Sequence, residues 1–109
     1  MEEKIVLLVR IQAKPGKKDR FLHQLYKVVE TMSVEANFVS AIVHHNIEKP
    51  NEVVIYETWN GTRETWLRDE LSRPYRKPYE QAVSELVDER SVDWLTPVAL
   101  DSLKRQAQV

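Results

Sequence analysis

The sequence predicts an α+β domain of the ferredoxin-like split β-α-β-β-α-β type with an antiparallel sheet. Two observations predict it: a β-branched apolar stretch gives way to helical spacing, and an apolar hairpin is followed by a second helical segment and a short strand. In this arrangement both helices cover one face of the sheet. We assign the 109 residues to one domain, 1–109, with a core of about 5–95 and a C-terminal tail at 99–109.

The first strand is expected at residues 5–11, which are apolar and end before a Pro-Gly pair at positions 15 and 16. From about Lys17 the apolar residues recur at steps of three and four, which predicts an amphipathic helix. Asp19 lies near its positive end, where a negative charge is favourable. The apolar stripe consists of Phe21, Leu22, Leu25, Tyr26, Val28, Val29 and Met32.

A hairpin is expected next, with strands at 38–47 and 52–59 around the turn Glu48-Lys49-Pro50-Asn51. Thr62 is the expected N-cap of a short helix that carries Trp66, Leu67 and Leu71. Pro74 is expected to start a further helix running through Val87, although one broken helix fits the pattern equally well. A last short strand is expected at 91–95, and residues 99–109 form a polar tail that is either a helical turn or frayed.

Both faces of the predicted sheet carry apolar side chains. On the first strand the odd-numbered residues from Ile5 to Ile11 are all apolar, and the even-numbered set still contains Val6 and Leu8. The helices of one chain cover only one face. We therefore expect a homodimer in which the bare sheet faces pack together into a dimeric α+β barrel.

The composition excludes several classes of function. Lys plus Arg number 16 and Asp plus Glu 17, so no charge excess attracts nucleic acid or a membrane surface. Without cysteine the chain has no disulfide, thiolate nucleophile, thiolate-ligated haem or iron–sulfur cluster. The start of the sequence shows no basic region followed by a long apolar run, which predicts a cytoplasmic location. We expect neither a metal nor another cofactor.

Five short motifs follow one another along the chain. They are Lys14-Pro15-Gly16-Lys17, Val34-Glu35-Ala36-Asn37 after the first helix, a strand carrying His44, the Pro50 turn, and Val53-Val54-Ile55-Tyr56-Glu57-x-Trp59 before a helix. In this order they together resemble the antibiotic biosynthesis monooxygenase family. The resemblance spans roughly residues 5–95 and implies a dimeric barrel with quinol-monooxygenase-like activity.

The sequence departs from this family pattern at several positions. Many members carry a His in the helix after the Trp and another following a Pro, whereas the nearest positions here are Glu70 and Tyr75. Asn37 stands where Gly is usual, and Ala41 where Tyr is common. The family includes cofactor-free quinol and anthrone oxygenases as well as haem-degrading enzymes.

Cofactor-free oxidation of a quinol- or anthrone-like aromatic needs an aromatic pocket, a base and donors for the developing anion. We expect this pocket between the sheet and the helices. The predicted catalytic residues are His44 and Glu57, since a symmetric hairpin would place His44 opposite Ile55 and diagonally near Glu57. A structural His–Glu hydrogen bond is the competing interpretation. The predicted substrate-binding residues are Arg10, His45, Asn46, Tyr56, Trp59, Trp66 and Tyr75.

Three alternatives stay open. The first is a non-catalytic ligand-binding or interaction dimer of the same fold. The second is haem degradation, which would have to use His44 or His45 as the axial ligand. The third is a role for the basic residues between Arg68 and Lys77 in binding an anionic substrate tail, although their alternation with acidic residues is typical of a solvated helix face. A metal site is not expected, because adjacent His44 and His45 point to opposite faces of a strand.

Overall fold

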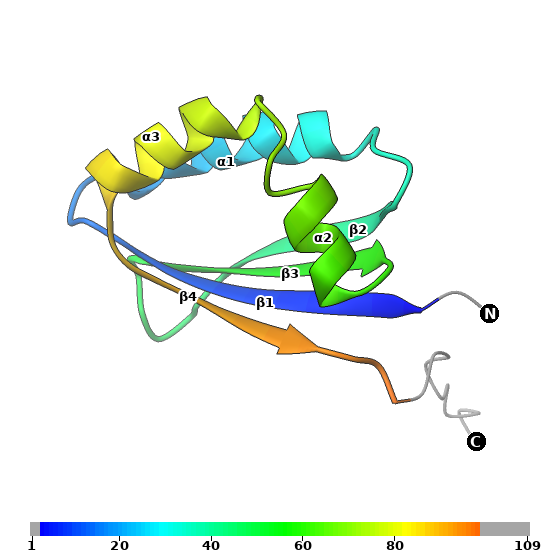
Figure 1. Ribbon diagram of the computed structural model, residues 1–109. Coiled ribbons are helices and arrows are strands. Elements are labelled where there is room, and N and C mark those ends of the chain that lie inside the picture. The colour runs from blue at the N-terminus through cyan, green and yellow to red at the C-terminus, as the bar shows by residue number, and fades with distance from the viewer. Residues whose placement is uncertain (1–2, 99–109) are drawn as a thin grey trace, which may run out of the picture.

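Four strands form one antiparallel sheet in the order β2-β3-β1-β4, and three helices accompany it (Figure 1). The computed structural model describes residues 3–98. The predicted ferredoxin-like fold is confirmed. The elements are β1 (Lys4–Ala13), α1 (Lys18–Met32), β2 (Phe38–His45), β3 (Glu52–Asn60), α2 (Arg63–Asp69), α3 (Arg76–Leu86) and β4 (Val87–Leu95).

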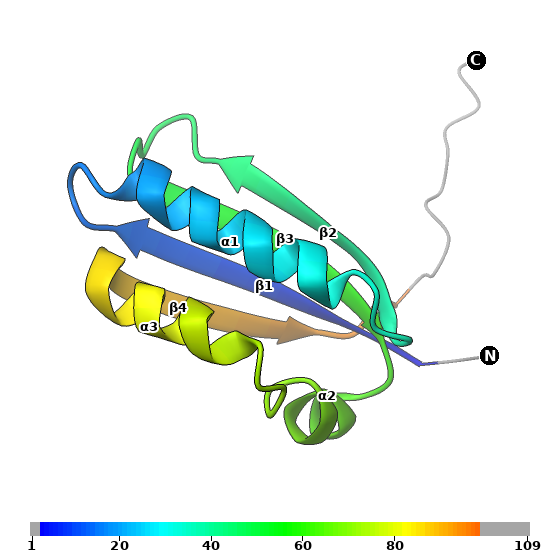
Figure 2. The same cartoon turned by 90° about the horizontal axis from the view of Figure 1, so that it is seen from above.

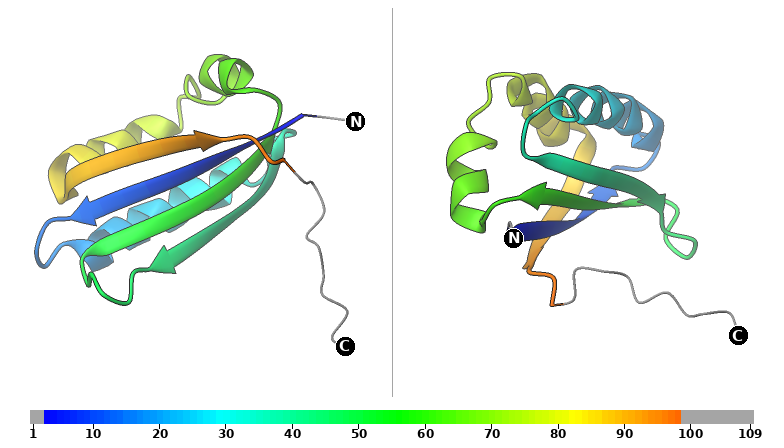
Figure 3. Two further views of the ribbon diagram at one scale, coloured as in Figure 1. Left: turned by 90° about the horizontal axis from the view of Figure 1, so that it is seen from below. Right: turned by 90° about the vertical axis from the view of Figure 1, so that its right-hand side faces the viewer.

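The helices divide between one face and one end of the sheet. Helices α1 and α3 lie side by side across the same face, and α2 lies beside the end of the sheet where β1 begins and β3 ends (Figures 1 and 2). Seen from below, the other face of the sheet carries no helix (Figure 3). No helix within residues 3–98 is long and apolar enough to cross a membrane.

The alternation along β1 decides which side chains form the core. Ile5, Leu7, Val9 and Ile11 are all buried under the helices. On β3 the partners of this set, at positions 53, 55, 57 and 59, face the same side, because opposed residues in an antiparallel pair share a face. Phe21, Leu25 and Met32 of α1 and Tyr79, Ala82 and Leu86 of α3 close this core from above.

The end of the chain differs from the sequence prediction in two respects. The region after the turn forms two separate helices, one of the two expected arrangements, but α3 begins at Arg76, later than the predicted start at Pro74. Strand β4 begins at Val87, directly after α3, and not at Ser91. Val87 lies opposite Ala13, and Val92 lies opposite Val9, so pairing with the long β1 extends the strand beyond its local apolar signal. The predicted tail at 99–109 lies outside the described residues.

The turn before α2 is built as the sequence predicts. The Thr62 side chain accepts from the Thr65 backbone N–H over 3.2 Å, and Thr65 Oγ1 accepts from the Thr62 N–H over 2.9 Å. This reciprocal capping box satisfies two backbone donors at the start of the helix. Gly61 before it has φ 113°, a conformation that residues with a Cβ rarely adopt.

The open face of the sheet exposes apolar side chains in the single chain. Tyr56 is 41% exposed, Ile42 54% and Leu95 42%. Tyr56 lies opposite both Ile42 and Leu8, so these side chains form one continuous row across β2, β3 and β1. An apolar row of this kind is typical of a surface that another molecule covers.

Candidate functional site

The hairpin register separates the two residues that the sequence predicts as a catalytic pair. His44 lies opposite Val54 and Glu57 lies opposite Ala41, one residue away from the predicted pairing. The symmetric pairing predicted from the four-residue turn is therefore wrong. Because successive side chains of a strand alternate, a slip of one residue moves a side chain to the other face. His44 lies on the open face and Glu57 under the helices, so the predicted contact between them does not form.

His44 has neighbours of a different kind from those expected. Its side chain is exposed, and Nδ1 lies 3.2 Å from the Val54 carbonyl oxygen, to which it donates when that nitrogen carries the proton. Arg10 on β1 also lies opposite Val54, so His44 and Arg10 belong to one row of the open face. Tyr56 lies on this face as well. Three of the predicted site residues therefore gather on the face that carries no helix.

His45 and Asn46 lie at the hairpin end of the sheet. His45 is exposed and lies opposite Val53, at the end of β3 remote from Trp59. Asn46 Nδ2 donates to Glu52 Oε1 over 2.6 Å, and Asn46 Oδ1 accepts from the Glu48 backbone N–H over 2.9 Å. These bonds give Asn46 a role in closing the hairpin, away from the buried aromatic residues.

Glu57 is a buried acid on the helix-covered face of β3. It is 7% exposed, and its Oε1 accepts from Trp59 Nε1 over 3.0 Å. The two side chains project to the same side because they are two residues apart on one strand. A carboxylate is almost never buried without a partner. The hydrogen bond from this indole N–H replaces part of the hydration that the Glu57 carboxylate loses on burial.

Burial also changes how readily Glu57 ionises. Loss of water around the side chain raises the pKa of Glu57 above its usual value. The hydrogen bond from Trp59 and the positive charge of Arg76 lower this pKa but do not cancel the effect of burial. A raised pKa makes a carboxylate a stronger base, which suits it to accepting a proton from a bound substrate.

The three tryptophans of the chain form one continuous row of edge-to-face contacts. Trp59 packs edge-on against Phe38, with ring centroids 5.2 Å apart, and against Trp66, at 6.3 Å. Trp66 in turn packs against Trp94 at 5.4 Å. The Arg63 guanidinium lies 5.1 Å from the Trp94 ring centroid. The row therefore runs from the buried end of β3 to α2 and β4, and Trp59 and Trp66 are neighbours in it.

Arg76 belongs to the basic run between Arg68 and Lys77, for which the sequence favours a solvated helix face over a role in binding an anionic substrate tail. The structure contradicts the solvated face at this position, because Arg76 is 7% exposed and its guanidinium lies 4.9 Å from the Trp66 ring centroid. Its Nε donates to the backbone oxygen of Glu70 over 2.9 Å. Spacing could have revealed it, since Arg76 precedes Tyr79 by three residues and therefore lies on the apolar stripe of α3.

The two positions where family members carry histidine belong to a polar network at the start of α3. Glu70 is 2% exposed, and its Oε1 lies 3.5 Å from Arg73 Nε. Arg73 also pairs with Glu35 Oε1 over 3.2 Å. Burial, followed by the nearby Glu35 carboxylate, raises the pKa of Tyr75 to about 12. The Tyr75 hydroxyl nevertheless has no partner in hydrogen-bond geometry. Where family members carry two imidazoles, this chain thus has a carboxylate and a phenol, with the Arg73 guanidinium and the Glu35 carboxylate beside them.

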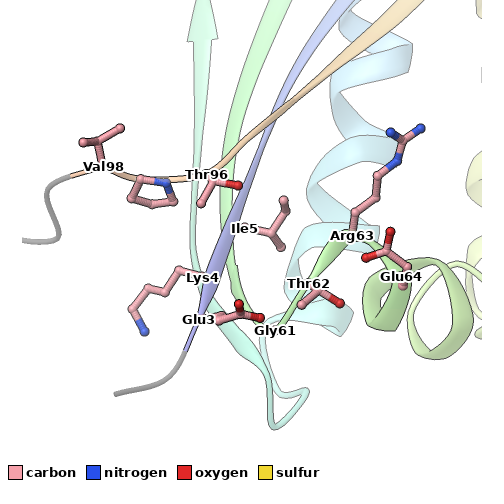
Figure 4. Close-up of a pocket in the computed structure, with 10 residues that line it drawn as sticks. Glu3, Lys4, Ile5, Gly61, Thr62, Arg63, Glu64, Thr96 and Val98 are labelled. Atoms are coloured by element: carbon pink, nitrogen blue, oxygen red, sulfur yellow. The ribbon is translucent and has the colours of Figure 1, made fainter.

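Two hollows open near these elements. One, of about 520 Å³, lies between the start of β1, the turn before α2 and residues 96–98, and Arg63 lines it (Figure 4). The other, of about 230 Å³, lies between α1 and α3 and is lined by Tyr75 and Tyr79. Burial raises the pKa of Tyr79, and the charge of Glu57 adds to this rise, so these two side chains lie near each other. Within residues 3–98 no cluster of three His, Asp or Glu side chains could hold a metal ion.

The family model for antibiotic biosynthesis monooxygenases matches residues 4–68, more than half of the chain. The chain belongs to this family. The match covers β1 through most of α2, including Glu57, Trp59 and Trp66, and it ends before Arg76. The resemblance noted from the sequence is thereby confirmed. No curated protein matches the chain.

Solved structures of similar fold extend this result beyond the matched segment. A Pseudomonas aeruginosa protein superposes with a TM-score of 0.80 at 18% identity, covering 91% of this chain and 98% of that chain. A Bacteroides thetaiotaomicron protein provisionally named an antibiotic biosynthesis monooxygenase gives 0.77 at 23% identity, covering 88% and 90%. A Nitrosomonas europaea protein with the same provisional name gives 0.80 at 14% identity, covering 94% and 97%. At these identities the likeness shows a common fold.

Proposed function

We propose that this antibiotic biosynthesis monooxygenase family member is a cofactor-independent oxygenase that oxidises a quinol- or anthrone-like aromatic with molecular oxygen. The observation that carries the proposal is Glu57, a buried acid of raised pKa set between the Trp59 indole and the charge of Arg76. Such a group can remove a proton from a bound phenol or activated CH₂ group. Aromatic side chains beside it suit a flat aromatic substrate.

The reaction balances without a cofactor when the substrate itself supplies the electrons. For an anthrone, Glu57 takes a proton from the CH₂ group, and the resulting carbanion transfers one electron to O₂. The two radicals combine into a peroxide anion, which takes the proton back from Glu57, and the resulting hydroperoxide loses water and leaves a carbonyl. One oxygen atom enters the product and the other leaves as water. The protein's share is to bind, deprotonate and exclude bulk water.

This proposal alters the role of the predicted catalytic residues. Glu57 stays a catalytic residue, but it is now the base itself and acts without His44, because the hairpin register puts that imidazole on the opposite face. Trp59, Trp66 and Tyr75 stay in the proposed substrate site. Arg10, His44 and Tyr56 instead share the open face of the sheet.

We also propose that the chain is a homodimer joined through this open face. Its exposed row of Ile42 and Tyr56 is too apolar to remain in water without cost. A twofold pairing of two identical rows buries both at once.

A non-catalytic ligand-binding dimer is the second candidate, and one observation favours it. Trp59 is fully buried, with Phe38 and Trp66 packed against its ring, so the protein's own aromatic residues occupy the space beside Glu57. In this interpretation Trp59, Phe38 and Trp66 are core residues, and the protein binds ligands without catalysing a reaction.

Oxygen consumption decides between the two functions. We expect the wild-type protein to consume O₂ faster than the uncatalysed rate with an anthrone or a menadiol-like quinol. Glu57→Gln should lower turnover by about 10²- to 10⁴-fold, the usual contribution of a positioned base. Glu30→Gln, which removes an exposed carboxylate of α1, is the matched control and should not change turnover. Binding of these aromatics without any O₂ uptake above background would support the binding dimer.

A further inference from the structure

The proposed substrate has no open route to Glu57 in this conformation. Glu57 is 7% exposed and Trp59 is fully buried, and the Trp66 ring packs against Trp59 with the centroids 6.3 Å apart. Neither of the two hollows described above is lined by any of these three residues. A flat aromatic molecule therefore reaches Glu57 only after one of the surrounding elements has moved.

Helix α2 is the element beside Glu57 with the least buried surface. Trp66 is the one buried side chain of this helix. Leu67 and Leu71, on the helix and just after it, are 39% and 49% exposed. The helix lies beside the end of the sheet, apart from the packed pair α1 and α3 (Figure 2). Segments with few buried apolar contacts open locally at a lower free energy than the core.

The segment that carries α2 lies between two joints. Gly61 precedes it with φ 113°, and glycine changes φ and ψ at little steric cost. Pro74 follows it, in the stretch between α2 and α3 that belongs to neither helix. Hinges are typically a few loop or element-terminal residues of this kind. Rotation about these two joints would move residues 62–73 together and carry Trp66 away from Trp59.

One ion pair holds the far end of this segment in place. Arg73 Nη2 lies 3.2 Å from Glu35 Oε1, just after α1. Among the ion pairs within residues 3–98, it alone joins the segment 62–73 to the rest of the chain. The Glu70 backbone oxygen also accepts from Arg76 Nε across the Pro74 joint, over 2.9 Å. Opening thus breaks two polar contacts and the packing of a single aromatic ring.

We propose that residues 62–73 form a lid over Glu57, hinged at Gly61 and Pro74, and that the Arg73–Glu35 ion pair is the latch that keeps it closed. Opening moves Trp66 off Trp59, so that a flat aromatic substrate can enter beside Glu57. Closing excludes bulk water from the bound substrate. The inference rests on the proposed function, since it concerns access to the same acid.

Hydrogen exchange tests the lid without any substrate. We expect the hydrogen-bonded amides of residues 66–70 to exchange about tenfold faster than the slowest amides of α1 and α3, through an opening that denaturant changes little. Arg73→Gln should raise this rate about two- to fivefold, the effect of losing a partly exposed ion pair, and should leave α1 unchanged. Glu35→Gln breaks the same contact and replaces Arg73→Gln if that variant does not fold.

Arg68→Gln is the matched control for this measurement. It removes an exposed ion pair with Asp69 inside the lid, and the exchange of residues 66–70 should stay as in the wild type. Exchange of these amides only by global unfolding would overturn the proposal. Equal rates in the latch variants and in Arg68→Gln would overturn it as well.

A reversible cross-link tests whether the lid controls access. The chain has no cysteine, so Glu35→Cys/Arg73→Cys carries only two thiols. A bis-methanethiosulfonate joins them in place of the ion pair, and a reductant releases them. We expect O₂ consumption with an anthrone to fall about tenfold or more on cross-linking and to return on reduction, because the closed lid blocks entry. The same variant capped with methyl methanethiosulfonate should stay active. Full turnover in the cross-linked protein would overturn the lid.

The lid and the oxygenase function fail in distinguishable ways. If the protein consumes no O₂ with any quinol or anthrone, the already oxidised anthraquinone-2-sulfonate replaces the substrate, and its association is followed by the quenching of tryptophan fluorescence. Association that slows on cross-linking and recovers on reduction would leave the lid standing without the oxygenase. Turnover that depends on Glu57 and ignores the cross-link would refute the lid alone.

Discussion

Trp59 Nε1 donates a 3.0 Å hydrogen bond to the carboxylate of Glu57, the residue two positions earlier on β3. The bond lies on the helix-covered face of the sheet, where both side chains are buried. It explains how an acid can occupy the core of a small domain, since the indole N–H faces the charge that burial disfavours. Because Glu57 is buried, its ionisation changes the stability of the folded protein.

The first prediction concerns the stability of the Glu57 variant. Burial raises the pKa of Glu57 above its usual value of 4.5, so the folded state holds this proton more tightly than the unfolded chain. The resulting contribution to stability is complete below pH 4.5 and is lost as the pH rises through the folded pKa. A Gln side chain cannot ionise, so Glu57→Gln avoids this loss of stability at high pH. We expect its Tm to exceed that of the wild type at pH 7 and to match it at pH 4.

The size of this effect and its control follow from the same reasoning. A change of about 1 kcal/mol shifts Tm by roughly 4–8 °C in a domain of about 100 residues. Glu30→Gln alters an exposed carboxylate and should leave the difference in Tm between pH 4 and pH 7 as in the wild type. A Glu57→Gln protein that is less stable than the wild type at pH 7 would show that the ionised carboxylate stabilises the core.

The second prediction concerns the open face of the sheet. Sedimentation at micromolar concentration should give twice the chain mass. Ile42→Lys places a charge at the β2 end of the exposed apolar row, opposite Tyr56, and should convert the protein to monomers or unfold it. Val34→Lys is the matched control, because Val34 is 83% exposed and follows α1, outside the sheet. A folded wild-type monomer at this concentration would refute the dimer.

The third prediction concerns His44, which the sequence predicts to be catalytic. Since its imidazole lies on the face opposite Glu57, we expect His44→Ala to keep O₂ consumption within about twofold of the wild type. His45→Ala, at the hairpin end, should behave alike. If His44→Ala lowered turnover as much as Glu57→Gln while keeping the dimer, His44 would be restored as a catalytic residue acting across the open face.

The fourth prediction compares the two glycines of the chain. Both have positive φ, but a Cβ on Gly61 would lie 2.5 Å from Thr65 Oγ1, whereas a Cβ on Gly16 meets nothing within 4 Å. Gly16→Ala should therefore cost only the backbone strain, about 1 kcal/mol or a little more, and Gly61→Ala should cost clearly more because it also disturbs the capping box. Urea unfolding measures both, and equal losses would show that Thr65 moves without cost.

Much of the fold follows from local patterns. The alternation of β1 marks its odd-numbered residues as the wholly apolar set, and Ile5, Leu7, Val9 and Ile11 are the residues buried under the helices. Thr62 is recognisable as an N-cap because its side chain acts on a helix that starts beside it. These features depend on neighbours a few residues away, so a single sequence reveals them.

The candidate site follows the sequence only in part. Glu57, Trp59 and Trp66 come together because a strand end and the following helix are joined by a short turn. The hairpin register could not be read in this way, since the pairing is centred on Lys49 and not between Lys49 and Pro50. Residue count in the turn does not specify that centre. A difference of one residue decided which face His44 occupies.

Thus the sequence alone determined the order of elements, the apolar side of β1 and the aromatic end of β3, because side-chain periodicity and turn chemistry act over short distances along the chain. Only the tertiary structure decided that Arg76 is buried against Trp66, and that His44 and Glu57 lie on opposite faces. Both facts depend on how distant segments pack, and a charged residue enters a core only when the fold supplies a ring face and a carbonyl to receive it.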